Sequence, residues 1–202
     1  MPIGLKGNSD GSGAIQIGGS DAISISTGLN TTFAGTITAT GTVAGTTGTL
    51  YPLVSGTAVA STSGTAIDFT GIPSWAKRIT VMFNGVSTNG SSNILVQIGA
   101  GSVTTSGYNG GTTFVVSASY SANSSGFLVA NSVGASAVYS GTAQINSIGS
   151  NGWVYTSNIA AATNVFVGGG AVTLGGTLDR VRVTTVGGTD TFDAGTINLL
   201  WE

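Results

Sequence analysis

The stretch RITVMFNGVSTNGSSNILVQIGA, residues 78–100, contains two strand-like segments separated by a turn-rich one. In RITVMF the apolar side chains alternate, which places Ile79, Val81 and Phe83 on one face of an extended chain. Residues 93–100 form a second apolar segment, and Asn, Gly and Ser lie between the two. This pattern is typical of antiparallel strands joined by a tight turn.

The same pattern continues through the chain after residue 53. No window of about 12 residues has the 3.6-residue period of an amphipathic helix. We expect strands at 64–69, 78–83, 93–100, 112–120, 125–131, 137–145, 151–158, 164–170, 178–186 and 196–202. Strands at this spacing predict an all-β fold, a β-sandwich or jelly roll, rather than a βαβ fold.

The last predicted strand places Ile197, Leu199 and Trp201 on one face. We therefore expect the C-terminus to be held within the sheet. The GGG at 168–170 has no following Lys and no helix, so it lacks the pattern of a phosphate-binding loop. We interpret it as a turn.

Charge is the most unusual feature of the composition. Only 6% of the 202 residues are charged, against about 25% in an average soluble protein. Between Arg78 and Asp179 lie 100 residues without Asp, Glu, Lys, Arg or His. Gly, Ser, Thr and Asn interrupt this run every few residues, so it does not predict a membrane-spanning helix. Five basic residues and a net charge of −2 disfavour nucleic acid as a partner, and the lack of a basic amphipathic helix disfavours the membrane surface.

The N-terminal part differs from the rest. Residues 1–50 contain one aromatic residue, Phe33, and short alternating apolar pairs such as Ile15 and Ile17. We predict that residues 1–53 form an extended N-terminal β-repeat stalk or docking arm and that residues 54–202 form a β-sandwich head. A flexible Gly/Thr-rich leader, ordered only where it docks, is the alternative. The sequence MPIGLKGNSDGSG lacks the pattern of a secretory signal, which favours assembly in a cytoplasm.

Few residues are suited to catalysis. The chain has no His and no Cys, which excludes Ser–His and Cys–His nucleophiles and thiolate metal sites. Asp190 and Asp193, in GGTDTFDAG, are either a hard-cation site or part of a turn, and the turn is favoured. A glycosidase that uses two carboxylates, drawn from these and Asp179, is the least favoured hypothesis. We therefore predict no enzyme activity, no cofactor and no metal site.

Two arginines lie on one side of a predicted strand. Arg180 and Arg182, in TLDRVRVTT, either hold the carboxylate of an acidic sugar or pair with Asp179, Asp190 or Asp68. Internal pairing is favoured, because charged side chains commonly mark the solvated face of a sheet.

Aromatic residues are the remaining candidates for binding. Trp75, Trp153 and Tyr108 are possible stacking platforms for host glycans, although a core or subunit-interface role is favoured for both tryptophans. Tyrosines in polar loops also suit adaptable contact surfaces. The tyrosines that we expect in such loops are Tyr108, Tyr120, Tyr139 and Tyr155.

Several segments together resemble a known family. GTAIDFTGIPSWAKRITVMFNGVSTNG (64–90), VQIG (96–99) and TLDRVRVTTVGGTDTFDAGTINLLWE (177–202) resemble a C-terminal domain that recurs in virion proteins of tailed bacteriophages. The N-terminal GSGAIQIGGSDAISISTGLNTTFAGTI (11–37) is similar to the short β-repeat stalks that precede such domains.

The resemblance implies a structural role on the virion, a jelly-roll-like head and a homotrimer. It implies partners among the other virion proteins, which we expect to contact Pro2, Ile3 and Leu5. A short fibre or decoration protein on the capsid surface is favoured. The alternative is a receptor-binding tail-fibre or spike tip that recognises host surface glycans. The resemblance carries no catalytic residue to this chain.

Overall fold

The computed structural model describes residues 4–7, 13–16, 43–45, 48–117, 119–131 and 134–202. The chain divides into two units, Met1–Gly41 and Thr42–Glu202. The predicted boundary followed residue 53, so the second unit also contains a short hairpin that the prediction assigned to the arm. Every regular element among the described residues is a β-strand, which confirms the all-β prediction.

In the first unit, β1 (Gly4–Gly7) and β2 (Gly13–Gln16) form an antiparallel hairpin in which Leu5 is opposite Ile15. Residues 17–42 of the predicted arm and the expected anchors Pro2 and Ile3 lie outside the described residues. The stalk therefore stays a prediction.

Sixteen strands belong to the second unit. They are β3 (Val43–Gly45), β4 (Gly48–Leu50), β5 (Val54–Ser55), β6 (Val59–Ala60), β7 (Ala66–Thr70), β8 (Arg78–Thr88), β9 (Ile94–Ala100), β10 (Ser102–Val103), β11 (Asn109–Phe114), β12 (Ser119–Ala122), β13 (Phe127–Leu128), β14 (Tyr139–Gly149), β15 (Gly152–Ala161), β16 (Asn164–Thr173), β17 (Arg180–Thr185) and β18 (Phe192–Trp201).

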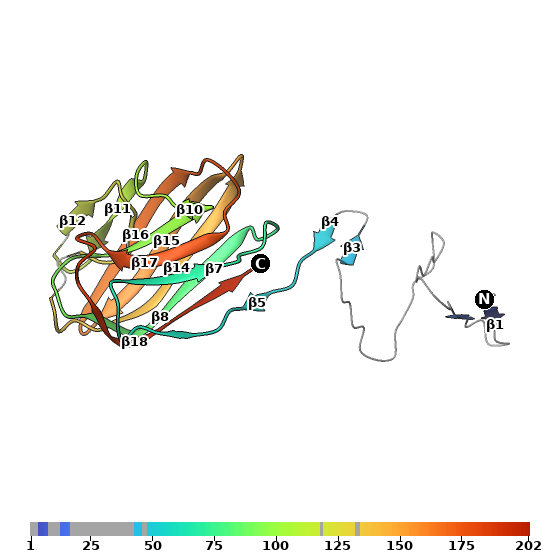
Figure 1. Cartoon of the computed structure of the whole chain (residues 1–202), viewed down its shortest axis with the longest axis horizontal. Helices are drawn as coiled ribbons and strands as arrows, with labels where there is room; N and C mark the ends of the chain where they lie inside the picture. The colour runs from blue at the N-terminus through green and yellow to red at the C-terminus, as the bar shows by residue number, and fades with distance from the viewer. Residues whose placement is uncertain (1–3, 8–12, 17–42, 46–47, 118, 132–133) are drawn as a thin grey trace. The chain divides into compact units, whose positions relative to one another are not determined.

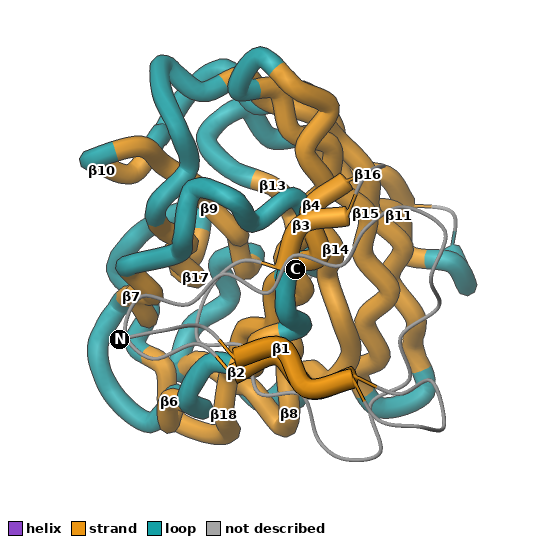
Figure 2. The backbone as a smooth tube through the Cα atoms, turned by 90° about the vertical axis from the view of Figure 1, so that its right-hand side faces the viewer, coloured by secondary structure: helices purple, strands orange, loops and turns teal. Residues whose placement is uncertain are grey.

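Two antiparallel sheets make up the head. The large sheet has the order β12-β11-β16-β15-β14-β8-β18-β5, and β6 also pairs with β18. The small sheet has the order β10-β9-β17-β7, and β13 also pairs with β9. Figures 1 and 2 show the sheets as two layers, with β7, β9, β10 and β17 in one and β11, β14, β15 and β16 in the other. The head is thus sandwich-like, as predicted.

The core lies between the two sheets and follows the alternation of each strand. Ile79, Val81 and Phe83 of β8 are all buried, as RITVMF predicts, and Ile197 and Leu199 of β18 are buried beside them. The small sheet contributes alternate residues in the same way. Burial of apolar surface at about 25 cal/mol per Å² makes this shared core the main source of the head's stability.

Aromatic rings connect the two layers. Phe127 of β13 stacks on Tyr155 of β15 with ring centroids 4.5 Å apart, and Tyr108 meets Phe127 edge-on at 4.8 Å. The Tyr155 hydroxyl donates to the Leu128 carbonyl of the small sheet. Stacked and edge-on aromatic pairs stabilise a fold beyond the effect of their buried area, so these rings help to hold the two sheets against each other.

The C-terminus is held within the large sheet, as predicted. Strand β18 pairs with β8 on one side and with β5 and β6 on the other. The amides of Lys77 and Arg78 donate to the Glu202 carbonyl at 2.7 and 2.9 Å, and Arg78 forms an ion pair with the Glu202 side chain. Trp201 is only partly buried, although it packs against the core.

Two predictions about local structure were wrong. The predicted strand 112–120 is two antiparallel strands, β11 and β12, with Val115 and Val116 exposed in the turn that joins them. The GGG at 168–170 is not a turn but part of β16. A Cβ at Gly170 would lie 2.7 Å from the Asn109 carbonyl oxygen, so the absent side chain lets β11 and β16 approach closely.

Candidate functional site

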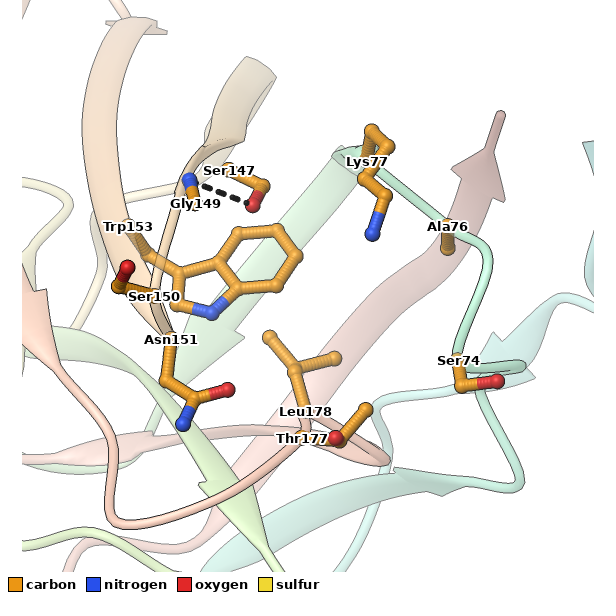
Figure 3. Close-up of a pocket in the computed structure, with 10 residues that line it drawn as sticks. All are labelled: Ser74, Ala76, Lys77, Ser147, Gly149, Ser150, Asn151, Trp153, Thr177 and Leu178. Carbon is orange, nitrogen blue, oxygen red and sulfur yellow. Dashed lines mark hydrogen bonds between the residues drawn. The ribbon is translucent and has the colours of Figure 1, made fainter.

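A pocket lies at one end of the head, beside the turn between β14 and β15. Its volume is about 180 Å³. The walls come from that turn, from the segment that precedes β8 and from the segment between β16 and β17, as Figure 3 shows. Its lining residues are Ser74, Ala76, Lys77, Ser147, Gly149, Ser150, Asn151, Trp153, Thr177 and Leu178.

The pocket has an apolar floor and a polar rim. Ala76, Trp153 and Leu178 are buried, with 4%, 5% and 3% of their surface exposed. Hydroxyl, amide and ammonium groups surround them on more exposed residues. Small-molecule sites commonly combine an apolar surface with a few polar groups that orient the ligand.

The β14–β15 turn has an unusual backbone. Ser150 and Asn151 form a two-residue connection with φ values of 49° and 60°, since Gly149 pairs with Gly152. Positive φ at both positions defines the type I′ turn, whose twist matches that of a hairpin. Asn tolerates this region well, whereas Ser adopts it at some cost.

Backbone hydrogen bonds fix the walls to one another. The Leu174 amide donates to the Asn151 carbonyl at 3.0 Å, which joins the β16–β17 segment to the turn. The Ser147 amide donates to the Lys77 carbonyl at 2.8 Å, which joins β14 to the start of β8. The pocket is therefore built into the fold.

Lys77 differs from the three arginines of the head. Arg78 pairs with Glu202, Arg180 with Asp179 and Arg182 with Asp68. Within the described part of the chain, Lys77 has no carboxylate within 4 Å. Its ammonium group points towards the space between Trp153 and Ala76 in Figure 3.

Trp153 contributes a buried donor without a partner. Its Nε1 atom has no hydrogen-bond acceptor among the described residues, although the side chain is nearly fully buried. In Figure 3 this nitrogen points to the side of the pocket where Asn151 and Leu178 lie. A buried polar group without a partner costs about 1–3 kcal/mol, so an acceptor in the pocket would be bound favourably.

The chemistry of this pocket is binding rather than acid–base catalysis. It presents an indole N–H and an ammonium group as donors, and hydroxyl and amide groups that both donate and accept. Its lining contains no carboxylate. An electronegative ligand with several oxygen atoms suits such a set of groups.

The carboxylates of the head make structural contacts elsewhere. Asp190 accepts from the Ser92 amide at 2.7 Å, and Asp193 accepts from the Ser87 hydroxyl. The former contact holds the β17–β18 connection against Gly90, where a Cβ would collide with the Asp190 carboxylate. No group of three or more acids that could hold a metal ion occurs among the residues described.

Arg180 and Arg182 take the internal pairing that the sequence favoured. Arg180 binds Asp179 through two hydrogen bonds of 2.8 and 3.0 Å, and Arg182 binds Asp68 through two of 2.7 Å. The Arg180 guanidinium lowers the pKa of the Asp179 carboxyl, and the Gly101 amide acts in the same direction. Hydrogen bonding to Asp68 raises the pKa of Arg182.

The expected stacking platforms lie in three different places. Tyr108 is 4% exposed, and its hydroxyl accepts from the Ile98 amide at 2.8 Å, so the ring is a core side chain. Trp153 is also buried, with 5% of its surface exposed. Trp75 is half-buried and stacks on Tyr51 at a centroid distance of 5.1 Å. The structure thus brings none of the three together as a stacking surface.

The prediction of a tyrosine contact surface was wrong for three of the four residues. Tyr108, Tyr139 and Tyr155 are buried, and only Tyr120 is exposed, at 63%. Burial raises the pKa of Tyr108 to about 12 and shifts that of Tyr155 in the same direction. The misleading signal was the polar context, because alternation in a long strand places a tyrosine inside among Ser and Thr.

Sequence reasoning missed most of the pocket. It singled out Trp153, but not Asn151, Thr177 or Leu178. The one available signal was SN at 150–151 between two apolar segments, which is suited to a tight hairpin turn. The proximity of Leu178 depends on a long-range strand order that single-sequence patterns do not contain.

In the described part of the chain no helix has the length and apolarity needed to cross a membrane. Comparison of the chain with protein-family models, curated proteins and solved structures finds no match.

Proposed function

We propose that this chain is a non-enzymatic structural protein of a bacteriophage virion, a short trimeric fibre or decoration protein on the capsid surface. In this role the head has a jelly-roll-like fold and projects outward from the virion. The N-terminal residues contact other virion proteins. Assembly takes place in the host cytoplasm. Its partners are further copies of the chain and neighbouring virion proteins, not nucleic acid or a membrane.

The observation that carries the proposal is the outer face of the large sheet. The adjacent strands β12, β11, β16, β15 and β14 all lie within the charge-free run between Arg78 and Asp179. One row of residues crosses this face from strand to strand without a charge. The row is Tyr120, Thr113, Val167, Asn158, Thr142, Met82 and Asn198.

An uncharged face of this width suits contact between protein copies. Cores of interfaces are depleted of charged residues, because a charge buried without a partner is costly. Val165 and Val167 of β16 are 38% and 48% exposed, and Tyr120 lies in the same row as Val167. Exposed apolar groups gathered on one face indicate an interaction site.

The use of the carboxylates supports a structural role as well. Each described acid takes part in a hydrogen bond or ion pair that links strands or loops of the head. Asp10 and Asp21 lie outside the described residues.

Fractionation of particles tests the virion role. An antibody against the chain is applied to a density gradient of particles from cells that carry its gene. We expect the chain to band with assembled particles and to be exposed on their surface. A chain found only in the soluble fraction, while particles assemble normally, would contradict the proposal.

A second role, recognition of host surface glycans by a receptor-binding tail-fibre or spike tip, is supported by the pocket beside Trp153. Among the described residues its indole N–H has no acceptor and Lys77 has no carboxylate partner, and both groups favour an oxygen-rich ligand. Binding of the chain to host cells, lost when their surface polysaccharide is removed, tests this role. Equal binding to stripped cells would count against it.

A further inference from the structure

We propose that the pocket beside Trp153 binds one six-membered ring that carries a carboxylate and several hydroxyl groups, as in a uronic acid residue of a polysaccharide. The inference rests on the second proposed role and names its ligand class. The virion role does not depend on it.

Size limits the ligand to one ring. The pocket has a volume of about 180 Å³. A cavity of about 150 Å³ holds one benzene ring, so one sugar ring fits and two do not. Backbone hydrogen bonds already join Asn151 to Leu174 and Ser147 to Lys77, so little ordering is needed when the ligand binds.

Charge specifies one carboxylate. Lys77 is the lone charged residue among those that line the pocket, and its ammonium group points into it. The neighbouring Arg78 is neutralised by Glu202. One carboxylate of the ligand, placed near Lys77, would therefore meet one positive charge that no described carboxylate neutralises.

Trp153 specifies an acceptor deep in the pocket. Trp153 lines the pocket, and its buried Nε1–H has no partner among the described residues. A ring oxygen or hydroxyl oxygen would accept from it, while the apolar face of the ring would rest on Leu178 and Ala76. This differs from the stacking on an exposed tryptophan face that the sequence suggested, because the Trp153 ring is buried.

The rim specifies hydroxyl groups. Ser74, Ser147, Asn151 and Thr177 carry side chains that can both donate and accept. Sugar hydroxyls also do both, whereas a simple carboxylate such as acetate cannot donate. The combination favours a hydroxylated acid over either a neutral sugar or a plain acid.

The test is a titration of the full chain with glucuronate, followed through the tryptophan indole N–H resonances. The chain has 3 tryptophans, and the spectrum of Trp153→Phe identifies the resonance of Trp153. We expect glucuronate to shift that resonance saturably, with a Kd of about 1 mM for a ring of this size. Glucose, which lacks the carboxylate, and acetate, which lacks the hydroxyl groups, should each bind about tenfold more weakly or worse.

Variants locate the binding. Lys77→Met should weaken glucuronate binding about tenfold, because it removes a charged hydrogen-bond donor. Arg182→Met is the matched control: it removes a cation from the other sheet and should leave the affinity unchanged. Trp153→Phe keeps an aromatic side chain but removes the indole N–H, and should weaken binding about tenfold when measured by calorimetry.

The outcomes are separable. No shift of the Trp153 resonance at glucuronate concentrations far above the expected Kd would overturn the inference. Equal affinity for glucose or for acetate would overturn the ligand class. An equal loss in Arg182→Met and Lys77→Met would overturn the site. None of these results bears on whether the chain bands with virions, so failure here and failure of the virion role are distinguishable.

Discussion

The outer faces of the two sheets differ, although their inner faces are alike. Outside the small sheet, Arg182 of β17 forms an ion pair with Asp68 of the neighbouring β7, and Arg180 forms one with Asp179. Outside the large sheet, five adjacent strands carry no charge at all. Charged pairs keep a sheet face hydrated, whereas a neutral face suits contact with another protein. This difference is the basis for proposing that the small sheet faces solvent and the large sheet faces a neighbour.

A charge placed on each face tests this difference and has the largest expected effect. Val167→Asp puts a carboxylate in the centre of the neutral face, and an unpaired charge buried there should weaken subunit association by about 2–5 kcal/mol per copy. Thr70→Asp puts the same charge on the small sheet and should leave association unchanged. Sedimentation of both variants measures the effect. Dissociation by Thr70→Asp alone would reverse the assignment of the faces.

Truncation of the inner faces should show that the sheets are equivalent there. Leu199 in the large sheet and Ile98 in the small sheet are both fully buried. Leu199→Ala and Ile98→Ala should each lower the free energy of unfolding by about 2–5 kcal/mol, because each leaves a cavity. Denaturant unfolding gives the values, with Thr70→Ala as an exposed control. A loss below about 1 kcal/mol in either variant would show that the sheets do not share one core.

High pH should loosen the junction between the sheets. Burial raises the pKa of Tyr108 from 10.0 to about 12, so the folded chain keeps a proton that the unfolded chain loses. Stability is therefore complete below about pH 10 and falls as the pH rises towards 12, with a loss at pH 11 of about 1.4 kcal/mol from Tyr108 alone. Tyr155 acts in the same direction. Unfolding measured from pH 8 to 11.5 should be steeper in the native chain than in Tyr108→Phe. Identical slopes would contradict this account of the junction.

The smallest effect concerns the ion pair on the small sheet. Asp68 and Arg182 are exposed by 45% and 36%, so solvent screens their attraction. A double-mutant cycle of Asp68→Ala and Arg182→Ala should give a coupling of at most about 1 kcal/mol, reduced further by salt. A coupling above about 2 kcal/mol that salt does not reduce would mean that the pair stabilises the fold and does more than keep the sheet face hydrated.

Periodicity predicted most of the head and little of the pocket. Alternation located β8, β9, β14, β15 and β16 within a few residues, and it assigned Ile79, Val81 and Phe83 to the core. It failed where the polarity of a strand resembles that of a turn, as in the GGG of β16, and where a short turn interrupts an apolar run, as at Val115. In both cases the partner strand decides the structure.

The pocket depends on pairings that no local pattern contains. Trp153 and Lys77 are far apart in sequence, and they meet because β14 lies between β15 and β8. The same limit explains Tyr139 and Tyr155, which local polarity placed in loops and which the long strands β14 and β15 bury. The resemblance to virion proteins stays a prediction, and it is the source of the expected trimer.

The mass of the full chain in solution tests the central claim most directly, namely that the neutral face of the large sheet joins copies of this chain. Sedimentation equilibrium should give three times the chain mass of 19.7 kDa, about 59 kDa, with no monomer at micromolar concentration. A species of 19.7 kDa at every concentration, unaffected by Val167→Asp, would contradict the account.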